Sequence, residues 1–321
     1  MSKFTTQRNF GFGKQMDWAG HQALKDIYGR GHFGTVASHA QRWRQFCHWA
    51  RSNHGINDAS NIDQLLLERY AAELADRVED ETLAVSYAQN LIVSANITLE
   101  ALRQDKAIRI ESPATWVGKR QIVRIRAPDG MDWADIDRLV DRLRQKNLHR
   151  AAVIVLLCRS FGIRLREAIL ANPADWQRQA RERGQIDVRE GTKGGRGKEV
   201  ERWVPVSECG LVALREAVQV RNRLGGQNLL RPDESFDDLV NDGEVHRARK
   251  VFHEFGIRGY HELRAAWACE RYGKMSGETA PVVQAGASPG QKNDDQFRLA
   301  LAGELGHDRV DVVAAYIGAR P

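Results

Sequence analysis

The stretch that decides the fold lies at residues 304–317 and reads Glu-Leu-Gly-His-Asp-Arg-Val-Asp-Val-Val-Ala-Ala-Tyr-Ile. Gly306 predicts the end of a helix, and Asp308, followed three residues later by Asp311, predicts the N-cap and acidic first turn of a new short helix. Tyr316 then falls near the end of that helix, about two and a half turns beyond His307. Taken alone, a tyrosine at such a position is most often a packed amphipathic side chain.

Two upstream segments give this tyrosine a chemical context. His261-Glu262-Leu263-Arg264 places an imidazole and a guanidinium on one face of a predicted helix. The segment 161–167, Phe-Gly-Ile-Arg-Leu-Arg-Glu, places Arg164 on a tight turn between two helices, with Glu167 one helical turn further on. Two fixed arginines, two histidines and a late tyrosine together indicate a phosphate held for attack by a tyrosine hydroxyl.

The composition restricts the class of protein. The 321 residues are enough for two domains, and 48 Lys and Arg against 42 Asp and Glu give a net charge of +6, which is compatible with binding to nucleic acid. No apolar run approaches the roughly 20 residues of a membrane span, and the N-terminus lacks the apolar core of a secretory signal. The four cysteines have no paired spacing, which argues against a zinc site or a disulfide framework. We therefore expect a cytoplasmic protein.

The order of helical, broken and mixed segments predicts the domain organisation. Residues 1–30 are expected to form a flexible basic arm, and residues 31–110 a helical domain with helices beginning near Thr35, Ile62 and Leu83. Residues 111–130, rich in Pro, Gly and cations, are expected to form a basic linker: either a solvated connection or a strap across a phosphate backbone. Residues 131–321 are expected to form a second domain.

The second domain is predicted to be mainly helical around a small β-hairpin, an α+β arrangement. The apolar run 151–158 could be a buried strand, but residues 147–160 are long enough for a core helix, which we favour. Two partly alternating segments, 185–189 and 199–206, flank a Gly-rich tip and predict the hairpin. Further helices are expected over 132 onward, 211–224, 246–255, 261–272 and 296–305, and residues 276–295 are expected to form a surface loop.

These motifs, in this order, resemble the tyrosine recombinase (phage integrase) family. They are Arg164 with Glu167, Lys193 on the hairpin, His261-x-x-Arg264, Leu305-Gly306-His307, and Tyr316 nine residues after His307. The resemblance covers the chain from about residue 132 to the end, and residues 35–110 resemble the family's helical core-binding domain by helix pattern. It implies a core-binding domain and a mixed catalytic domain that hold duplex DNA at a specific attachment site, acting as a homo-oligomer expected to be a tetramer.

The resemblance also implies roles for individual residues. Tyr316 would be the nucleophile that forms a 3′-phosphotyrosyl intermediate and frees a 5′-hydroxyl. Arg164 and Arg264 would meet the charge on the non-bridging oxygens, and His307 would hydrogen-bond the scissile phosphate. His261 would assist proton transfer from the tyrosine, and Lys193 would be the general acid, with Lys198 as its rival. No metal, nucleotide or other cofactor is expected.

Several points remain open at this level. The interval from Arg264 to His307 is longer than is usual in the family by roughly twenty residues, which the loop 276–295 accounts for. Five residues of the sequence follow Tyr316, whereas family members commonly have a further segment that docks on a neighbouring protomer, so the route of subunit coupling is in doubt. The alternatives are a type IB topoisomerase-like enzyme and a non-catalytic DNA-binding accessory protein. Contacts to DNA are expected from Arg42, Arg44, Lys119, Arg120, Arg124, Arg126, Arg196 and Lys198.

Overall fold

The computed structural model describes residues 7–192, 197, 199–284, 293–307 and 309–320, and the chain divides into two compact units, residues 1–121 and 122–321. Both units are predominantly helical, and the described residues contain a single two-stranded antiparallel sheet. The predicted class, mainly α with a small β-hairpin, is confirmed. None of the helices in the described part of the chain combines the length and apolar character needed to cross a membrane.

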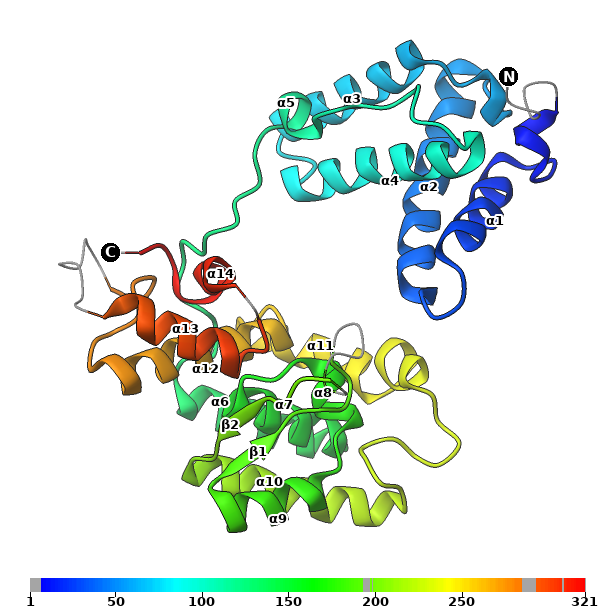
Figure 1. Ribbon diagram of the computed structural model, residues 1–321. Coiled ribbons are helices and arrows are strands. Elements are labelled where there is room, and N and C mark those ends of the chain that lie inside the picture. The colour runs from blue at the N-terminus through cyan, green and yellow to red at the C-terminus, as the bar shows by residue number, and fades with distance from the viewer. Residues whose placement is uncertain (1–6, 193–196, 198, 285–292, 308, 321) are drawn as a thin grey trace. The chain divides into compact units, whose positions relative to one another are not determined.

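The described residues of the first unit form five α-helices, which Figure 1 labels α1 to α5. The three helices predicted between residues 35 and 106 are confirmed, with ends shifted by a few residues, as α2, α3 and α4. Their core is aromatic, with Trp43, Phe46 and Tyr70 buried. The bounds are α1 Met16–Tyr28, α2 Phe33–His54, α3 Gln64–Glu79, α4 Val85–Arg103 and α5 Pro113–Val117, with short 3-10 turns at Arg8–Gly11 and Ala59–Asn61.

The flexible arm predicted for residues 1–30 is wrong over most of its length, because helix α1 packs into the core of the first unit. Met16, Ala19, Gly20, Ala23 and Leu24 form its buried face. An ideal Cβ at Gly20 would lie 2.2 Å from the indole nitrogen of Trp43, so only glycine allows this close approach. The indole N–H donates to the carbonyl oxygen of Met16 at 3.0 Å. Three of these five residues are small, so the segment carries little of the hydrophobic signal by which a buried helix is recognised.

The basic segment 111–130, predicted as a linker, is structured at both ends. Its first part contains α5, which packs on α3 and α4 with Val117 buried. Its last part belongs to the second unit, where Arg124 forms an ion pair with Glu262 and Asp129 forms one with Arg258 at 2.9 Å. The division between the two units falls between Gln121 and Ile122 along the chain, so the connection between them is a short part of the segment.

The second unit is built around a short hairpin and a long buried helix. Strands β1 Gln185–Asp187 and β2 Trp203–Pro205 pair antiparallel with Ile186 opposite Val204, which confirms the predicted hairpin. The predicted core helix is confirmed as α7 His149–Phe161, in which every residue after His149 is buried. The other helices are α6 Trp133–Gln145, α8 Leu165–Leu170, α9 Pro173–Arg183, α10 Glu208–Leu224, α11 Glu244–Glu254, α12 Tyr260–Ser276, α13 Asp294–Glu304 and α14 Ala314–Ile317, with a π-helical turn at Asp238–Asp242 and a 3-10 turn at Val310–Val313.

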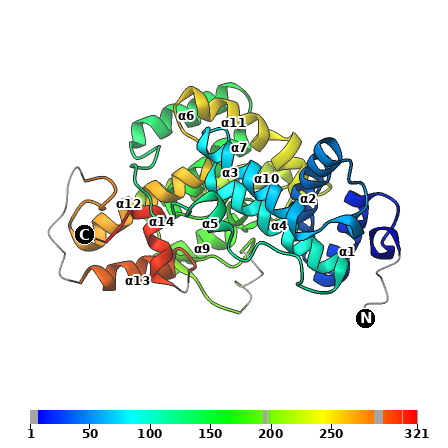
Figure 2. The same ribbon diagram turned by 90° about the horizontal axis from the view of Figure 1, so that it is seen from above.

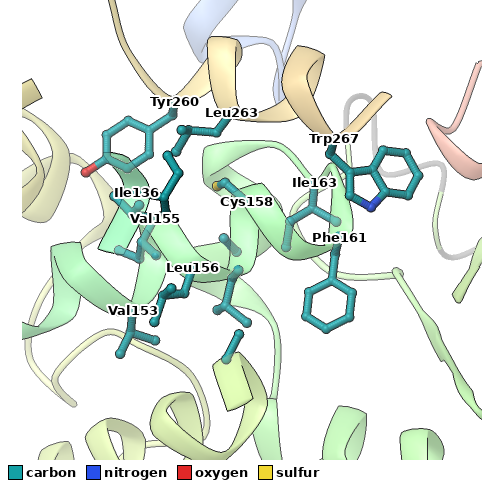
Figure 3. Close-up of a cluster of buried hydrophobic side chains, with 14 of the residues drawn as sticks. Ile136, Val153, Val155, Leu156, Cys158, Phe161, Ile163, Tyr260, Leu263 and Trp267 are labelled. Atoms are coloured by element: carbon teal, nitrogen blue, oxygen red, sulfur yellow. The ribbon is translucent and has the colours of Figure 1, made fainter. Parts of the chain in front are cut away.

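Packing of α12 on α7 positions the residues of interest. Figure 3 shows Tyr260, Leu263 and Trp267 reaching from α12 toward the apolar side chains of α7 and of the turn that follows it. At that turn Gly162 has φ +60°, and an ideal Cβ there would lie 2.1 Å from the Trp267 ring. The glycine therefore lets the end of α7 lie directly against α12. As a result, Arg164 and Arg264 point into one region although they are 100 positions apart in the sequence.

The C-terminal helices α13 and α14 lie together beside α12 (Figures 1 and 2). The turn after α13 is closed by Gly306, with φ +66°, and the backbone N–H of His307 donates to the Ala302 oxygen at 2.8 Å. Asp308, predicted as an N-cap, lies outside the described residues. The final short helix begins as the 3-10 turn at Val310 and continues into the single α-helical turn that carries Tyr316.

Candidate active site

Arg164 stands at the N-terminus of α8 and is fixed by Glu167. The Glu167 carboxylate accepts the backbone N–H of Arg164 at 2.7 Å and its guanidinium at 2.8 Å, so Glu167 caps the start of the helix and orients the Arg164 side chain. The Arg164 side chain is 28 % exposed, which leaves part of the guanidinium free to meet a ligand.

Glu167 is fully buried and lies among three guanidinium groups. Besides Arg164, its oxygens lie 2.9 Å from Arg202 Nη1 and 4.0 Å from Arg264 Nη1. Burial alone would raise the pKa of the Glu167 carboxyl, but the charges of Arg202 and Arg264 outweigh it and hold the pKa below its usual value. One carboxylate therefore orients three cations and leaves the cluster with a net positive charge.

Arg264 is 1 % exposed and is held mainly by backbone carbonyl groups. Its guanidinium donates to the carbonyl oxygens of Gly162 and Leu305, one in the turn after α7 and one in the turn after α13. Burial, together with the like charges of Arg202 and Arg164, lowers the pKa of Arg264 to about 10, so this arginine remains charged at neutral pH. The side chain thus ties three elements of the second unit together at the site.

The hydroxyl group of Tyr316 lies at the centre of this cluster. It accepts a hydrogen bond from Arg264 Nε at 3.3 Å and lies 3.2 Å from His307 Nε2. The Arg264 guanidinium also lies over the tyrosine ring, 5.3 Å from its centroid. The residue is 5 % exposed, so its hydroxyl is directed into the cation cluster.

His307 Nε2 also lies 3.4 Å from Arg164 Nη2 and 3.5 Å from Arg264 Nη2. Arginine can only donate, so a hydrogen bond at either contact would have Nε2 as the acceptor. Burial and the neighbouring charges of Arg264 and Arg164 lower the pKa of His307 to about 4. A neutral imidazole nitrogen within hydrogen-bond distance of a phenol can receive its proton.

His261, at the start of α12, lies against the other side of the tyrosine. The centroids of the two rings are 5.4 Å apart, while the histidine remains exposed. Partial desolvation and the Arg264 charge lower the pKa of His261. Its contact with Tyr316 is made through the ring, whereas His307 meets the hydroxyl itself.

Arg202 is a member of the cluster that the sequence motifs missed. It directly precedes strand β2, is 6 % exposed, and lies beside Glu167; its Nε donates to the carbonyl oxygen of Glu304 at the end of α13 at 2.7 Å. Burial lowers the pKa of Arg202, and the Glu167 carboxylate opposes this shift. One sequence signal was available, namely a cation immediately before the apolar return strand of the hairpin.

Part of this cluster lines a cavity of about 540 Å³. Its walls include Arg164, Arg202 and His307, and the base of the hairpin tip contributes Thr192 and Gly197. The tip residues Lys193, Arg196 and Lys198, predicted as general acid, DNA contact and rival acid, lie outside the described residues. The cavity is a cation-lined site of the size and charge that suit an oxyanion such as a phosphate diester.

The other described cations predicted to contact DNA are not among the residues that line this cavity. Arg42 is partly buried, and Arg44 is exposed, 3.8 Å from Asp17. Lys119 and Arg126 are exposed; Arg120 donates to the side chains of Gln89 and Asn90. Arg124 is the exception among them, because its ion pair with the buried Glu262 is itself largely buried and holds the segment on the second unit.

Comparisons with known proteins give one family and one fold. Residues 120–270 match the family model described as "Integrase". No curated protein is similar enough to the sequence to match it. Among solved structures, the chain is similar to a lambda integrase (75–356) dimer bound to a COC′ core site, with 16% identity, 92% of each chain covered and a TM-score of 0.57. It is also similar to the Tn1549 transposon integrase in complex with a circular intermediate DNA, with 14% identity, 96% of each chain covered and a TM-score of 0.58.

Proposed function

We propose that this chain, which matches the integrase family model over residues 120–270 and has the fold of tyrosine recombinases, is a site-specific DNA recombinase that breaks and rejoins duplex DNA through Tyr316. The observation that carries the proposal is the position of the Tyr316 hydroxyl, 3.2 Å from His307 Nε2 and 3.3 Å from Arg264 Nε, beside the cation-lined cavity. A phenol in hydrogen-bond reach of both a neutral base and a fixed cation is poised to attack an oxyanion bound there.

The scissile phosphate would lie against Arg164 and Arg264. Charge grows on its non-bridging oxygens as the phenol attacks, and guanidinium groups fixed by a buried carboxylate meet that charge without having to reorganise. Arg202 supports this arrangement from the side through its contact with Glu167. We assign Arg202 a positioning role because its guanidinium is buried between Glu167 and the Glu304 carbonyl group.

The reaction needs one group that accepts the phenolic proton and another that protonates the leaving 5′-oxygen. The distances favour His307 as the acceptor of the phenolic proton before DNA binds, and His261, exposed beside the ring, as the group that assists it. Attack forms a bond from the Tyr316 oxygen to phosphorus and breaks the bond to the 5′-oxygen, which leaves as a hydroxyl after protonation. Lys193 is the proposed donor, since its neighbour Thr192 lines the cavity. The reverse attack by a 5′-hydroxyl restores the phosphodiester and the free tyrosine.

The partner would be duplex DNA at a specific site, and the assembly a homo-oligomer, for which a tetramer is the working proposal. Structures with this fold include a lambda integrase tetramer bound to a Holliday junction, with 16% identity and a TM-score of 0.55. The biological role that fits best is integration or excision of a phage or mobile element. The four cysteines are free in the structure, which agrees with action in the cytoplasm.

Strand exchange between two duplexes tests the proposed function. Labelled duplexes taken from the DNA that flanks the gene would be incubated with the protein, and recombinant strands would be separated on a denaturing gel. The proposal predicts strands that join the two labels, formed without ATP or divalent metal. Relaxation of supercoiled DNA without exchange would instead favour the topoisomerase-like activity, and binding without any covalent adduct would favour an accessory protein.

A further inference from the structure

The proposed nucleophile, Tyr316, lies on a helix that is too short to be stable by itself. Helix α14 has four residues and no side-chain cap, and isolated helices of this length are not stable. Its position must therefore come from outside contacts. Two of its backbone carbonyl groups have partners from other segments. The backbone N–H of Arg124 donates to the Ala314 carbonyl oxygen at 2.9 Å, and the Cys269 thiol lies 3.6 Å from the Tyr316 carbonyl oxygen.

Arg298 of α13 forms hydrogen bonds to the backbone of Gly318 and Ala319, shortly after the tyrosine. This arginine is 1 % exposed, and its two terminal nitrogens donate to the carbonyl oxygens of Gly318 at 3.2 Å and Ala319 at 2.8 Å. Its Nε donates to Asp294 at 2.7 Å, and the same carboxylate accepts the hydroxyl of Tyr272 at 2.6 Å. The contacts run from α12 through α13 to the backbone that leaves α14, three elements that lie together in Figures 1 and 2.

A described residue of the loop predicted over residues 276–295 contributes to the same anchor. The backbone N–H of Val282 donates to the Ile317 oxygen at 2.9 Å. Gly318 has φ +91°, and an ideal Cβ at this position would lie 3.0 Å from Val282. The chain after Tyr316 therefore turns closely under residue 282 and into the reach of Arg298.

Burying an arginine lowers the stability of the fold unless its N–H groups have hydrogen-bond partners. Here the Arg298 guanidinium donates to one carboxylate and to two backbone oxygens of the segment after the nucleophile. In the described part of the chain, the hydrogen bonds and the ion pair of the Arg298 side chain go to Asp294, Gly318 and Ala319, and not to Arg164, Arg202, Arg264 or His307. It can thus fix where the tyrosine lies without touching the groups that would bind the phosphate.

We propose that Arg298 is a positioning residue for the nucleophile: by holding the Gly318 and Ala319 carbonyl groups it fixes the Tyr316 hydroxyl at its attack position. The inference rests on the proposed function, since it concerns the tyrosine of that reaction. It assigns Arg298 to the tyrosine side of the reaction and not to activation of the phosphate.

The first measurement is the rate of covalent adduct formation on a nicked suicide duplex. Arg298→Ala should slow it by roughly 10- to 100-fold, the cost of a small misplacement of a reacting group, while the affinity for the duplex is unchanged. Arg298→Lys keeps the charge beside Asp294 but cannot donate to both carbonyl groups in the same way. Its rate of adduct formation should therefore fall between the rates of wild type and Arg298→Ala. The matched control is Arg320→Ala, which removes an exposed ion pair with Asp295 from the same tail and should match wild type.

The second measurement separates the tyrosine from the phosphate. In a Tyr316→Phe background, hydrogen peroxide serves as a small external nucleophile, and strand cleavage then reports on phosphate activation alone. The proposal predicts that adding Arg298→Ala or Arg298→Lys leaves this cleavage unchanged. Equal loss of peroxide cleavage in both variants would overturn it, because Arg298 would then support the whole site. Wild-type protein that forms no adduct at all would instead contradict the proposed function.

Discussion

The phenolic oxygen of Tyr316 lies 3.2 Å from Nε2 of His307, and the same nitrogen lies 3.4 Å from Arg164 Nη2 and 3.5 Å from Arg264 Nη2. The pair joins the nucleophile to a base that the surrounding charges keep unprotonated. This relationship makes the protonation state of one imidazole a measurable property of the site.

His307 should titrate far below an ordinary histidine. Burial and the charges of Arg264 and Arg164 lower its pKa to about 4, so in the DNA-free protein its imidazole should stay neutral from pH 8 to about pH 5. Nuclear magnetic resonance of labelled histidine side chains can follow this titration directly. A His307 pKa near the usual value of about 6.5 would contradict the buried, cation-rich surroundings described for it.

The same shift predicts how stability depends on pH. A base whose pKa is lower in the folded state takes up protons more readily when the chain unfolds, so its contribution is present above about pH 6.5 and is lost as the pH falls toward 4. The His307→Gln variant lacks this titration. Chemical unfolding between pH 7 and pH 4 should therefore show a smaller loss of stability in His307→Gln than in wild type, and parallel losses would argue against the shift.

The buried carboxylate of Glu167 should be important for folding as well as for the site. Glu167→Gln keeps the volume but leaves the buried guanidinium groups of Arg202 and Arg264 without a counter-charge, which should cost roughly 3–5 kcal/mol of unfolding free energy. Urea denaturation provides the measurement. Glu201→Gln, which breaks the exposed pair with Arg189, is the control and should leave the unfolding midpoint unchanged. A Glu167→Gln protein as stable as wild type would contradict the proposed role of this carboxylate in holding the three arginines.

Arg202 should affect the charge on the phosphate through its neighbours. Arg202→Met is expected to slow cleavage of ordinary DNA by about 10²–10³-fold, the loss seen when a group that stabilises transition-state charge is disturbed. On a duplex with a methylphosphonate at the scissile position one charged oxygen is absent, so the deficit of the variant should become much smaller. Arg183→Met alters the same hairpin by removing a cation that stacks on Trp203, outside the cavity, and should behave as wild type on both substrates. An undiminished deficit on the neutral substrate would leave Arg202 with a purely structural role.

The sequence predicted the elements whose signals are local. The Arg164 turn, the His261-x-x-Arg264 helix and the step from His307 to Tyr316 are short motifs, and the structure brings these residues within contact of one another. Helix α1 was missed because its buried face consists largely of small residues that fit under Trp43.

The motif spacings did not identify Arg202 or Arg298, since each is buried against residues about 20 to 100 positions away. A sequence pattern carries periodicity and spacing along the chain, whereas each of these two arginines also donates to backbone oxygens at or just beyond the end of another element. The same holds for residue 282, whose role arises from a single hydrogen bond to the Ile317 oxygen.

The choice of general acid between Lys193 and Lys198 has a chemical test. A general acid is needed only while the leaving 5′-oxygen is basic, and replacing that bridging oxygen by sulfur gives a leaving group that needs no proton. Lys193→Ala should cleave normal DNA roughly 10²–10⁴-fold more slowly and the sulfur-bridged duplex at nearly the wild-type rate. Arg164→Ala should show no such rescue. If Lys198→Ala is the rescued variant, the acid is the second lysine of the hairpin tip.

The most direct test of the account is covalent capture of DNA by wild type and by Tyr316→Phe on a nicked suicide duplex. The substitution removes only the hydroxyl that contacts His307 and Arg264 and keeps the packed ring, so the fold and the DNA affinity should be retained. The account predicts a 3′-phosphotyrosyl adduct for wild type, located at residue 316 by mass spectrometry of the digested complex, and no adduct for the variant. An adduct that persists in Tyr316→Phe would contradict the central claim, because another residue would then be the nucleophile.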